Sequence, residues 1–141
     1  MRRGGSWMLC GLFLTLCAAT AAQAPDNVPT RVIEVLADKD SRYKIAGERT
    51  PQIVVRAGEL VRLRITARKG KSWNRDGSIH GFSLLRAKDR SKVPGWDFLL
   101  RPGTQEFSLA APQEAGEYVV VCTVICSEDH EGMFMKFVVT P

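Results

Sequence analysis

Hydrophobic and polar residues alternate along much of this chain. The clearest case is the segment 60–67, in which Val61, Leu63 and Ile65 alternate with polar or charged residues. A period of two residues is typical of a β-strand with one buried face. Similar alternation, or a short apolar run bounded by turn residues, predicts eight further strands at residues 31–36, 43–45, 52–55, 78–84, 96–100, 105–109, 116–121 and 135–140.

Turn residues separate these segments. Gly58, Pro102-Gly103 and Ala115-Gly116 interrupt the alternation, and the polar stretch 68–77 is expected to be a long loop. No window has the period of 3.6 residues that a long amphipathic helix requires. Short strands joined by turns predict an all-β sandwich or barrel.

The first 24 residues have the layout of a secretory signal peptide. Two arginines form a basic start, an apolar stretch follows, and Ala22-Gln23-Ala24 offers a cleavage site. We therefore expect an exported protein, periplasmic or otherwise extracytoplasmic, with a short linker at 25–30 and one domain at 31–141. The alternative is an uncleaved membrane anchor, for which the apolar stretch is short. Membrane contact is expected only in that case.

Charge and size narrow the classes of function. The formal net charge of the whole chain is +5, and loss of Arg2 and Arg3 with the leader lowers it to +3. This excess is too small to predict nucleic-acid binding. A single domain of about 110 residues buries enough surface to fold without disulfides.

Cysteine and histidine are scarce, and outside the leader they form one pattern. Cys122, Cys126 and His130 follow one another closely and are followed by Met133, while the second histidine is His80. Two thiolates, two imidazoles and a thioether form a soft ligand set, which favours copper over magnesium, calcium or manganese. A loop between two strands can direct several of these side chains at one centre.

Three other interpretations of these residues are open. Cys122 and Cys126 could form a disulfide in an oxidising compartment, but such a bridge would be tight and would leave His130 and Met133 without a role. Both cysteines and both histidines could bind a structural zinc ion, which would leave Met133 unused. All of these side chains could also be core residues that bind no metal.

With these motifs, residues 31–141 resemble the cupredoxin superfamily. The resemblance rests on Gly58 before a strand, on His80-Gly81-Phe82, and on the spacing C-x3-C-x3-H-x2-M that ends at Met133. More narrowly, this spacing is similar to that of the binuclear copper A domain of cytochrome c oxidase subunit II and of nitrous oxide reductase. The resemblance implies a Greek-key β-sandwich with a copper centre at one end.

The resemblance also implies a set of metal ligands. Cys122 and Cys126 would bridge two copper ions, and the remaining ligands would be His80, His130, Met133 and the backbone carbonyl of Val124. A mononuclear blue-copper site needs only one cysteine, two histidines and an axial methionine. Cys122 is therefore the residue that favours two ions over one.

The function implied by the resemblance is the transfer of single electrons between redox partners, such as a c-type cytochrome and an oxidase or reductase. Val124 stands where oxidase subunits carry a glutamate, and the chain has at most one membrane helix where they usually carry two. Both departures favour a free-standing exported domain. A copper carrier for oxidase assembly is the alternative. No nucleophile–base arrangement is visible, so catalysis is expected at most as an electron-entry subunit of an oxidase-like complex.

Three surfaces are candidates for docking a partner. Phe134, beside the ligand loop, could form an apolar patch or belong to the core. The acids Glu128, Asp129 and Glu131 would suit a cationic protein such as a c-type cytochrome. A basic set would suit an acidic partner and comprises Arg62, Arg64, Arg68, Lys69, Lys71 and Arg75. Each charged set is also explained as an ordinary solvated surface.

Overall fold

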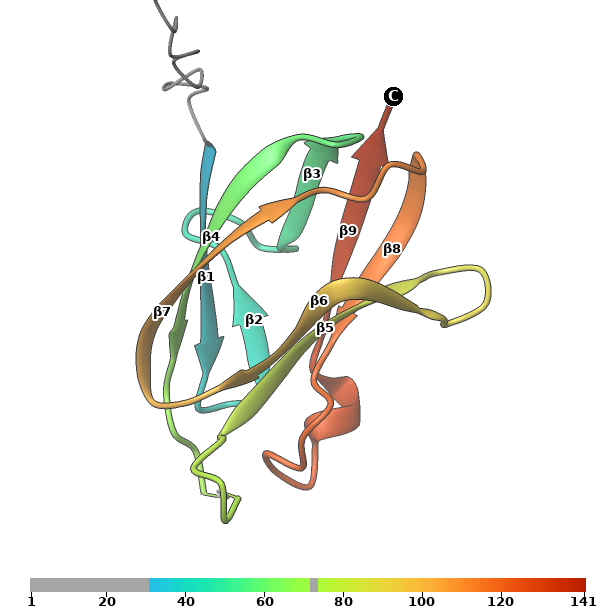
Figure 1. Ribbon diagram of the computed structural model, residues 1–141. Helices are drawn as coiled ribbons and strands as arrows, with labels where there is room; N and C mark the ends of the chain where they lie inside the picture. The colour runs from blue at the N-terminus through green and yellow to red at the C-terminus, as the bar shows by residue number, and fades with distance from the viewer. Residues whose placement is uncertain (1–30, 72–73) are drawn as a thin grey trace, which may run out of the picture.

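The computed structural model describes residues 31–71 and 74–141, and it contains two β-sheets that pack face to face (Figure 1). The first sheet has the strand order β2-β1-β4-β7 and consists of β1 (Arg31–Asp38), β2 (Arg42–Lys44), β4 (Leu60–Ala67) and β7 (Gly103–Ala110). The second has the order β3-β9-β8-β5-β6 and consists of β3 (Gln52–Arg56), β5 (His80–Arg86), β6 (Lys92–Leu100), β8 (Gly116–Val121) and β9 (Phe134–Thr140). The predicted all-β sandwich is confirmed.

The leader and the linker at 25–30 lie outside the described residues, so cleavage and export stay predictions. Within the part of the chain that the structure covers, none of the helical segments has the length and apolar character needed to cross a membrane.

All the predicted strands are present in the described ranges, although several ends differ. The segments 60–67 and 116–121 coincide with β4 and β8. β6 begins at Lys92 rather than at Trp96, because β6 is an edge strand and an edge strand accepts a proline such as Pro94. The one helical turn among the described residues is η1 (His130–Gly132).

The strand order does not follow the order of the chain. β1 pairs in parallel with β4, and β3 pairs in parallel with β9, while the remaining pairs are antiparallel. The chain therefore crosses between the sheets several times, which produces the expected Greek-key sandwich.

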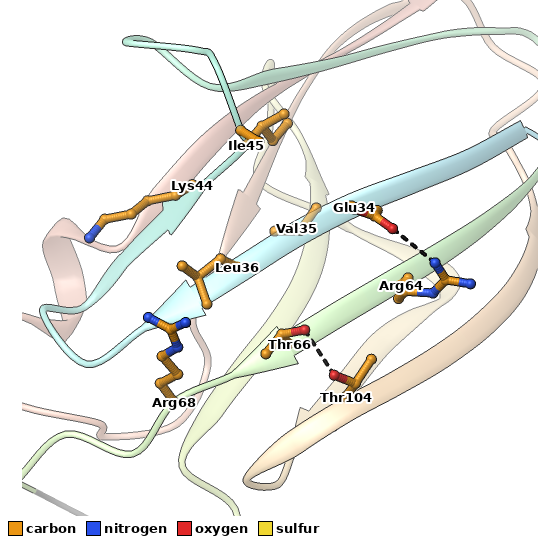
Figure 2. Close-up of a pocket in the computed structure, with 10 residues that line it drawn as sticks. Glu34, Val35, Leu36, Lys44, Ile45, Arg64, Thr66, Arg68 and Thr104 are labelled. Carbon is orange, nitrogen blue, oxygen red and sulfur yellow. Dashed lines mark hydrogen bonds and ion pairs between the residues drawn. The ribbon is translucent and has the colours of Figure 1, made fainter.

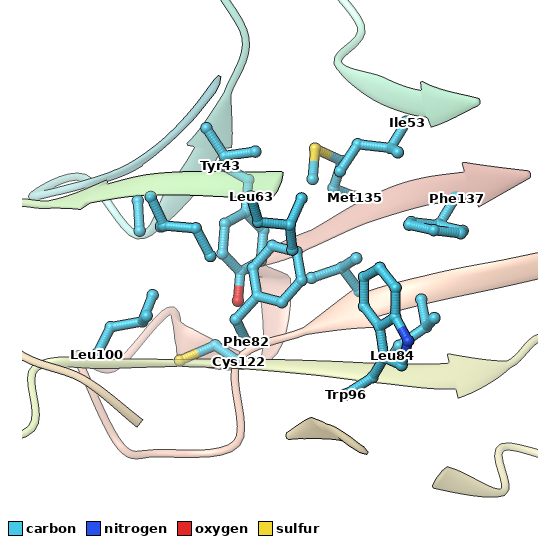
Figure 3. Packing of buried hydrophobic residues seen from close by; sticks show 14 of the residues in the cluster. Tyr43, Ile53, Leu63, Phe82, Leu84, Trp96, Leu100, Cys122, Met135 and Phe137 are labelled. Carbon is cyan, nitrogen blue, oxygen red and sulfur yellow. The ribbon is translucent and has the colours of Figure 1, made fainter. Parts of the chain in front are cut away.

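The hydrophobic core lies between the two sheets (Figure 3). Leu63 of β4, Phe82 of β5 and Phe137 of β9 are fully buried. Trp96 packs edge-to-face on Phe137 with ring centroids 5.3 Å apart, an arrangement that aromatic pairs favour. Cys122 belongs to the same buried cluster, so the core extends to the loop that carries the cysteines.

Three connections meet at one end of the sandwich, the lower end in Figure 1. They are the β1–β2 turn, the loop from β4 to β5 that includes the predicted polar stretch, and the loop from β8 to β9. Ser41 of the β1–β2 turn contacts Ser127 of the β8–β9 loop, and His80 contacts the carbonyl of Arg68 across the base of the β4–β5 loop. This end holds the predicted metal ligands.

Candidate metal centre

The β8–β9 loop brings both cysteine sulfurs to this end of the sandwich. Cys122 directly follows β8, and both Cys122 and Cys126 are buried, free cysteines with their Sγ atoms 3.6 Å apart. His80 is the first residue of the neighbouring strand β5. A ring nitrogen of His80 and the two sulfurs all lie within 4.8 Å of one another, close enough to hold one metal centre.

The imidazole of His80 has one paired and one unpaired nitrogen. Nε2 lies 3.0 Å from the carbonyl oxygen of Arg68 and donates to it, so Nδ1 carries a lone pair. Nδ1 is buried and has no hydrogen-bond partner among the described residues. Leaving a buried polar atom unpaired costs about 1–3 kcal/mol. Histidines that bind metals commonly donate their other N–H to a carbonyl, so this ring fits a metal ion at Nδ1.

Two further predicted ligands lie beside the sulfurs. The Sδ atom of Met133 is 3.9 Å from the Sγ atom of Cys126, and Met133 is almost fully buried. The Sγ atom of Cys122 is 3.2 Å from the carbonyl oxygen of Val124. The backbone N–H of Cys122 donates to the carbonyl of Met133 at 3.1 Å, which ties the two ends of the loop together.

His130 is the predicted ligand that lies outside the close group. It begins η1, is half-buried, and its Nδ1 atom lies 3.2 Å from the carbonyl oxygen of Ser127. The group of neighbouring ligand atoms found in the described ranges consists of His80, Cys122 and Cys126. Metal binding by His130 therefore stays a prediction.

Two residues that the sequence did not identify as parts of the site contact the cysteine sulfurs. The backbone N–H of Gly81 donates to the Sγ atom of Cys122 at 3.3 Å. The Oγ atom of Ser41, in the β1–β2 turn, is 3.7 Å from the Sγ atom of Cys126. The sequence contains no signal for either contact, because each joins residues from distant parts of the chain.

Residue 81 must be a glycine for steric reasons. A Cβ atom there would lie 2.5 Å from the Oγ1 atom of Thr123 and 2.7 Å from its backbone nitrogen. Both distances are much shorter than a normal van der Waals contact. The absence of a side chain lets β5 approach the cysteine loop closely enough for the Gly81–Cys122 hydrogen bond.

No family model and no curated protein matches this chain, but its structure is similar to solved ones. Auracyanin A, a "blue" copper protein of the green thermophilic photosynthetic bacterium Chloroflexus aurantiacus, is 20% identical, with a TM-score of 0.55 over 77% of this chain and 98% of that one. This chain has the cupredoxin fold. Auracyanin B is 18% identical, with a TM-score of 0.53 over 85% of this chain and 96% of that one.

Burial shifts the pKa values of three side chains at this end of the cupredoxin fold. It raises the pKa of the Cys122 thiol to about 11, and it lowers the pKa of His80 despite the hydrogen bond to Arg68. Burial, with the nearby cysteines, also raises the pKa of Tyr43 well above its ordinary value. At neutral pH the metal-free centre therefore holds a thiol at Cys122 and a neutral imidazole, and a metal ion has to displace the thiol proton.

Two residues of the predicted basic set, Arg64 and Arg68, line a groove on another surface. On the outer face of the first sheet, a groove of about 390 Å³ is bordered by Arg64, Arg68 and Thr104 (Figure 2). Arg64 donates to Glu34 at 2.8 Å and to Glu106 at 2.7 Å. This arginine is paired within its own sheet, as expected for the solvated face of a strand.

The apolar side chains that are candidates for docking a partner differ in their exposure to solvent. Phe137 is fully buried in the core, whereas Phe134 is 62% exposed. Ile125, which lies between the two cysteines in the loop, is 68% exposed. Apolar surface is therefore available in the cysteine loop, at Ile125, and at the start of β9, at Phe134.

Proposed function

We propose that this protein binds copper at the end of its sandwich and transfers single electrons. The observation that carries the proposal is the buried group of His80, Cys122 and Cys126, in which the Nδ1 atom of His80 has no partner among the described residues. Thiolate, thioether and imidazole donors together favour copper. Bound copper would supply the change between Cu(I) and Cu(II), and the protein would hold the donors in place.

Burial of the donors supports electron transfer over copper delivery. His80 and Met133 are 1% exposed, Cys126 is 2% exposed and Cys122 is 8% exposed. A carrier needs exposed ligands that exchange readily. We therefore expect slow loss of copper to a chelator together with a reversible reduction potential. Rapid loss of copper would favour the carrier instead.

We propose that the centre holds two copper ions. Both cysteine sulfurs are buried and free, 3.6 Å apart, and so are available to bridge. A different observation favours one ion: auracyanin A, which has the same fold, is described as a "blue" copper protein. Elemental analysis of copper-loaded protein should find two coppers per chain. One copper per chain would establish the mononuclear alternative, and zinc without copper uptake would overturn both.

Replacing Cys122 by serine tests whether two ions share the centre. The bridging thiolate would be lost, so the electron paramagnetic resonance pattern of one unpaired electron shared by two coppers should disappear. Some copper should remain through Cys126 and His80. Met133→Leu is the control and should have a milder effect, because a weak thioether ligand mainly tunes the potential. An unchanged spectrum for Cys122→Ser would rule out the binuclear centre.

Export and the redox partner are further parts of the proposal. The signal-peptide pattern supports export, and N-terminal sequencing of the native protein should begin at Pro25; retention of Met1 in a membrane fraction would indicate an anchor.

The exposed side chains of Ile125 and Phe134 support docking of a redox protein such as a c-type cytochrome, an oxidase or a reductase. Stopped-flow mixing with reduced c-type cytochrome should show rapid electron transfer, and no transfer would exclude that partner.

A further inference from the structure

We infer that the β1–β2 hairpin is a positioning element for the copper centre, in which Ser41 and Tyr43 control the hydrogen bonds to both cysteine sulfurs. The inference rests on the proposed copper centre and concerns residues that are not metal ligands. Ser41 acts on Cys126, and Tyr43 acts on Cys122 through Gly81.

Ser41 occupies a constrained position in the turn. Its backbone φ is +57°, in the left-handed region that residues other than glycine rarely adopt. Its backbone N–H donates to the carbonyl of Asp38 at 3.1 Å, and only 3% of the residue is exposed. The turn therefore directs the Ser41 hydroxyl inward, where it lies 2.6 Å from the hydroxyl of Ser127 and 3.7 Å from the Sγ atom of Cys126.

The donors and acceptors around Ser41 form a consistent chain when Cys126 is a metal-bound thiolate. Such a sulfur has no proton to donate, so the Ser41 hydroxyl donates to it. The Ser127 hydroxyl then donates to Ser41, and the backbone N–H of Asp129 donates to Ser127 at 3.1 Å. Each hydroxyl donates once and accepts once, so Ser41 provides the Cys126 sulfur with a fully supported donor.

Tyr43 positions Gly81, whose backbone N–H donates to the sulfur of Cys122. The Tyr43 hydroxyl donates to the carbonyl of Gly81 at 2.5 Å, and the N–H of Gly81 donates to the Sγ atom of Cys122 at 3.3 Å. The Tyr43 ring is buried and packs edge-to-face on Phe82, with centroids 5.6 Å apart. Tyr43 therefore holds in place the residue whose N–H contacts the sulfur of Cys122.

The expected consequence is a higher reduction potential. A hydrogen bond to a metal-bound thiolate stabilises the more electron-rich, reduced centre, and hydrogen bonding around the cysteine sulfur is a known determinant of potential at copper sites. Removing the hydroxyl of Ser41 or of Tyr43 should therefore favour the oxidised state of the copper centre without removing a metal ligand.

The test compares copper-loaded variants of the full-length protein by redox titration and electron paramagnetic resonance. Ser41→Gly and Ser41→Ala both remove the hydroxyl, but only glycine suits the left-handed backbone. We expect both variants to bind as much copper as the wild type. In each, the ratio of reduced to oxidised protein at a fixed potential should fall about tenfold, which corresponds to a shift of ~59 mV for one electron.

Tyr43→Phe should produce a smaller shift in the same direction and an altered copper spectrum. Its matched control is Tyr118→Phe, because the Tyr118 hydroxyl also donates to a backbone carbonyl, that of Glu114, away from the centre. Unchanged potentials in both Ser41 variants, or equal shifts in the two tyrosine variants, would overturn the inference while leaving the proposed function intact. Absence of copper from the wild-type protein would reject the proposed function and this inference together.

Discussion

His80 and Cys122, two of the side chains that converge on the proposed centre, are each held by a nearby backbone group. The carbonyl of Arg68 fixes the ring of His80, and the N–H of Gly81 contacts the sulfur of Cys122. The carbonyl of Met133 accepts the N–H of Cys122. Because these supports belong to strand ends rather than to free side chains, the donors are positioned before any metal binds.

His80 should make the metal-free protein less stable in mild acid. Burial lowers its pKa in the folded protein, so on acidification the unfolded chain binds a proton on this ring that the folded protein does not bind. The stability should therefore fall as the pH drops through the ordinary histidine value of about 6.5, until the lower pKa of the folded state is reached.

Thermal unfolding of chelator-treated protein between about pH 8 and pH 5 measures this effect. The melting temperature of the wild type should fall more steeply with acidification than that of His80→Gln, which cannot titrate at this position. Other acidic and basic groups contribute equally to both proteins. Parallel curves for the two proteins would show that His80 does not carry the effect.

At the scale of the elements, β5 and the β8–β9 loop pack closely together beside the centre. β5 lies between β8 and β6 in the second sheet, and its first five residues are all buried. The hydroxyl of Ser83 on β5 lies 3.0 Å from the hydroxyl of Thr123 in the loop. The strand and the loop are thus joined beside both the histidine and the first cysteine.

Gly81→Ala should separate these two elements. The added methyl group would meet the backbone nitrogen of Thr123 at 2.7 Å, so either β5 or the loop must move. We expect a loss of about 1–3 kcal/mol in the free energy of unfolding and weaker copper binding, measured by urea denaturation and copper titration.

Gly132→Ala is the control for this substitution. Its methyl group would meet only the end of the flexible Arg42 side chain, at 3.3 Å, and should cost much less. A similar loss of stability at both positions would mean that the close approach at Gly81 is not responsible.

For the molecule as a whole, the proposed copper centre is the place where three segments that lie far apart along the chain meet. The Ser41 contact comes from the β1–β2 turn, the His80 ligand from β5, and the sulfur ligands from the β8–β9 loop. These segments meet at one end of the sandwich, where the buried core reaches Cys122, Cys126 and Met133. A bound ion would therefore connect β5 directly to the β8–β9 loop, and the β1–β2 turn would contact it only through Ser41 and the sulfur of Cys126.

Copper should raise the thermal stability of the whole domain. A ligand that binds only the folded state stabilises it by about 4 kcal/mol when its free concentration is ~1,000-fold above its Kd. Differential scanning calorimetry should show a higher melting temperature with copper and reversal by a chelator. The increase should be smaller for Cys126→Ser, which loses a buried sulfur donor. A copper-independent melting temperature would contradict binding to the folded protein.

The sequence alone was sufficient for most of the local structure and for locating the loop with the candidate cysteines. Alternating residues such as Val61, Leu63 and Ile65 identified β4 because side chains on a strand point to opposite faces in turn. The spacing from Cys122 to Met133 indicated the loop that supplies most of the proposed ligands, because these residues lie between two strands. Both signals depend only on residues that are close together along the chain.

The tertiary structure decided the features that depend on distant residues. Ser41 and Ser127 are 86 positions apart, and their contact exists only because the two sheets bring the β1–β2 turn to the cysteine loop. The parallel pairing of β1 with β4 and of β3 with β9 likewise has no local pattern. The direction of the His130 ring depends on hydrogen bonds within its loop. Periodicity records which face of a strand is buried, whereas only packing determines which buried faces meet.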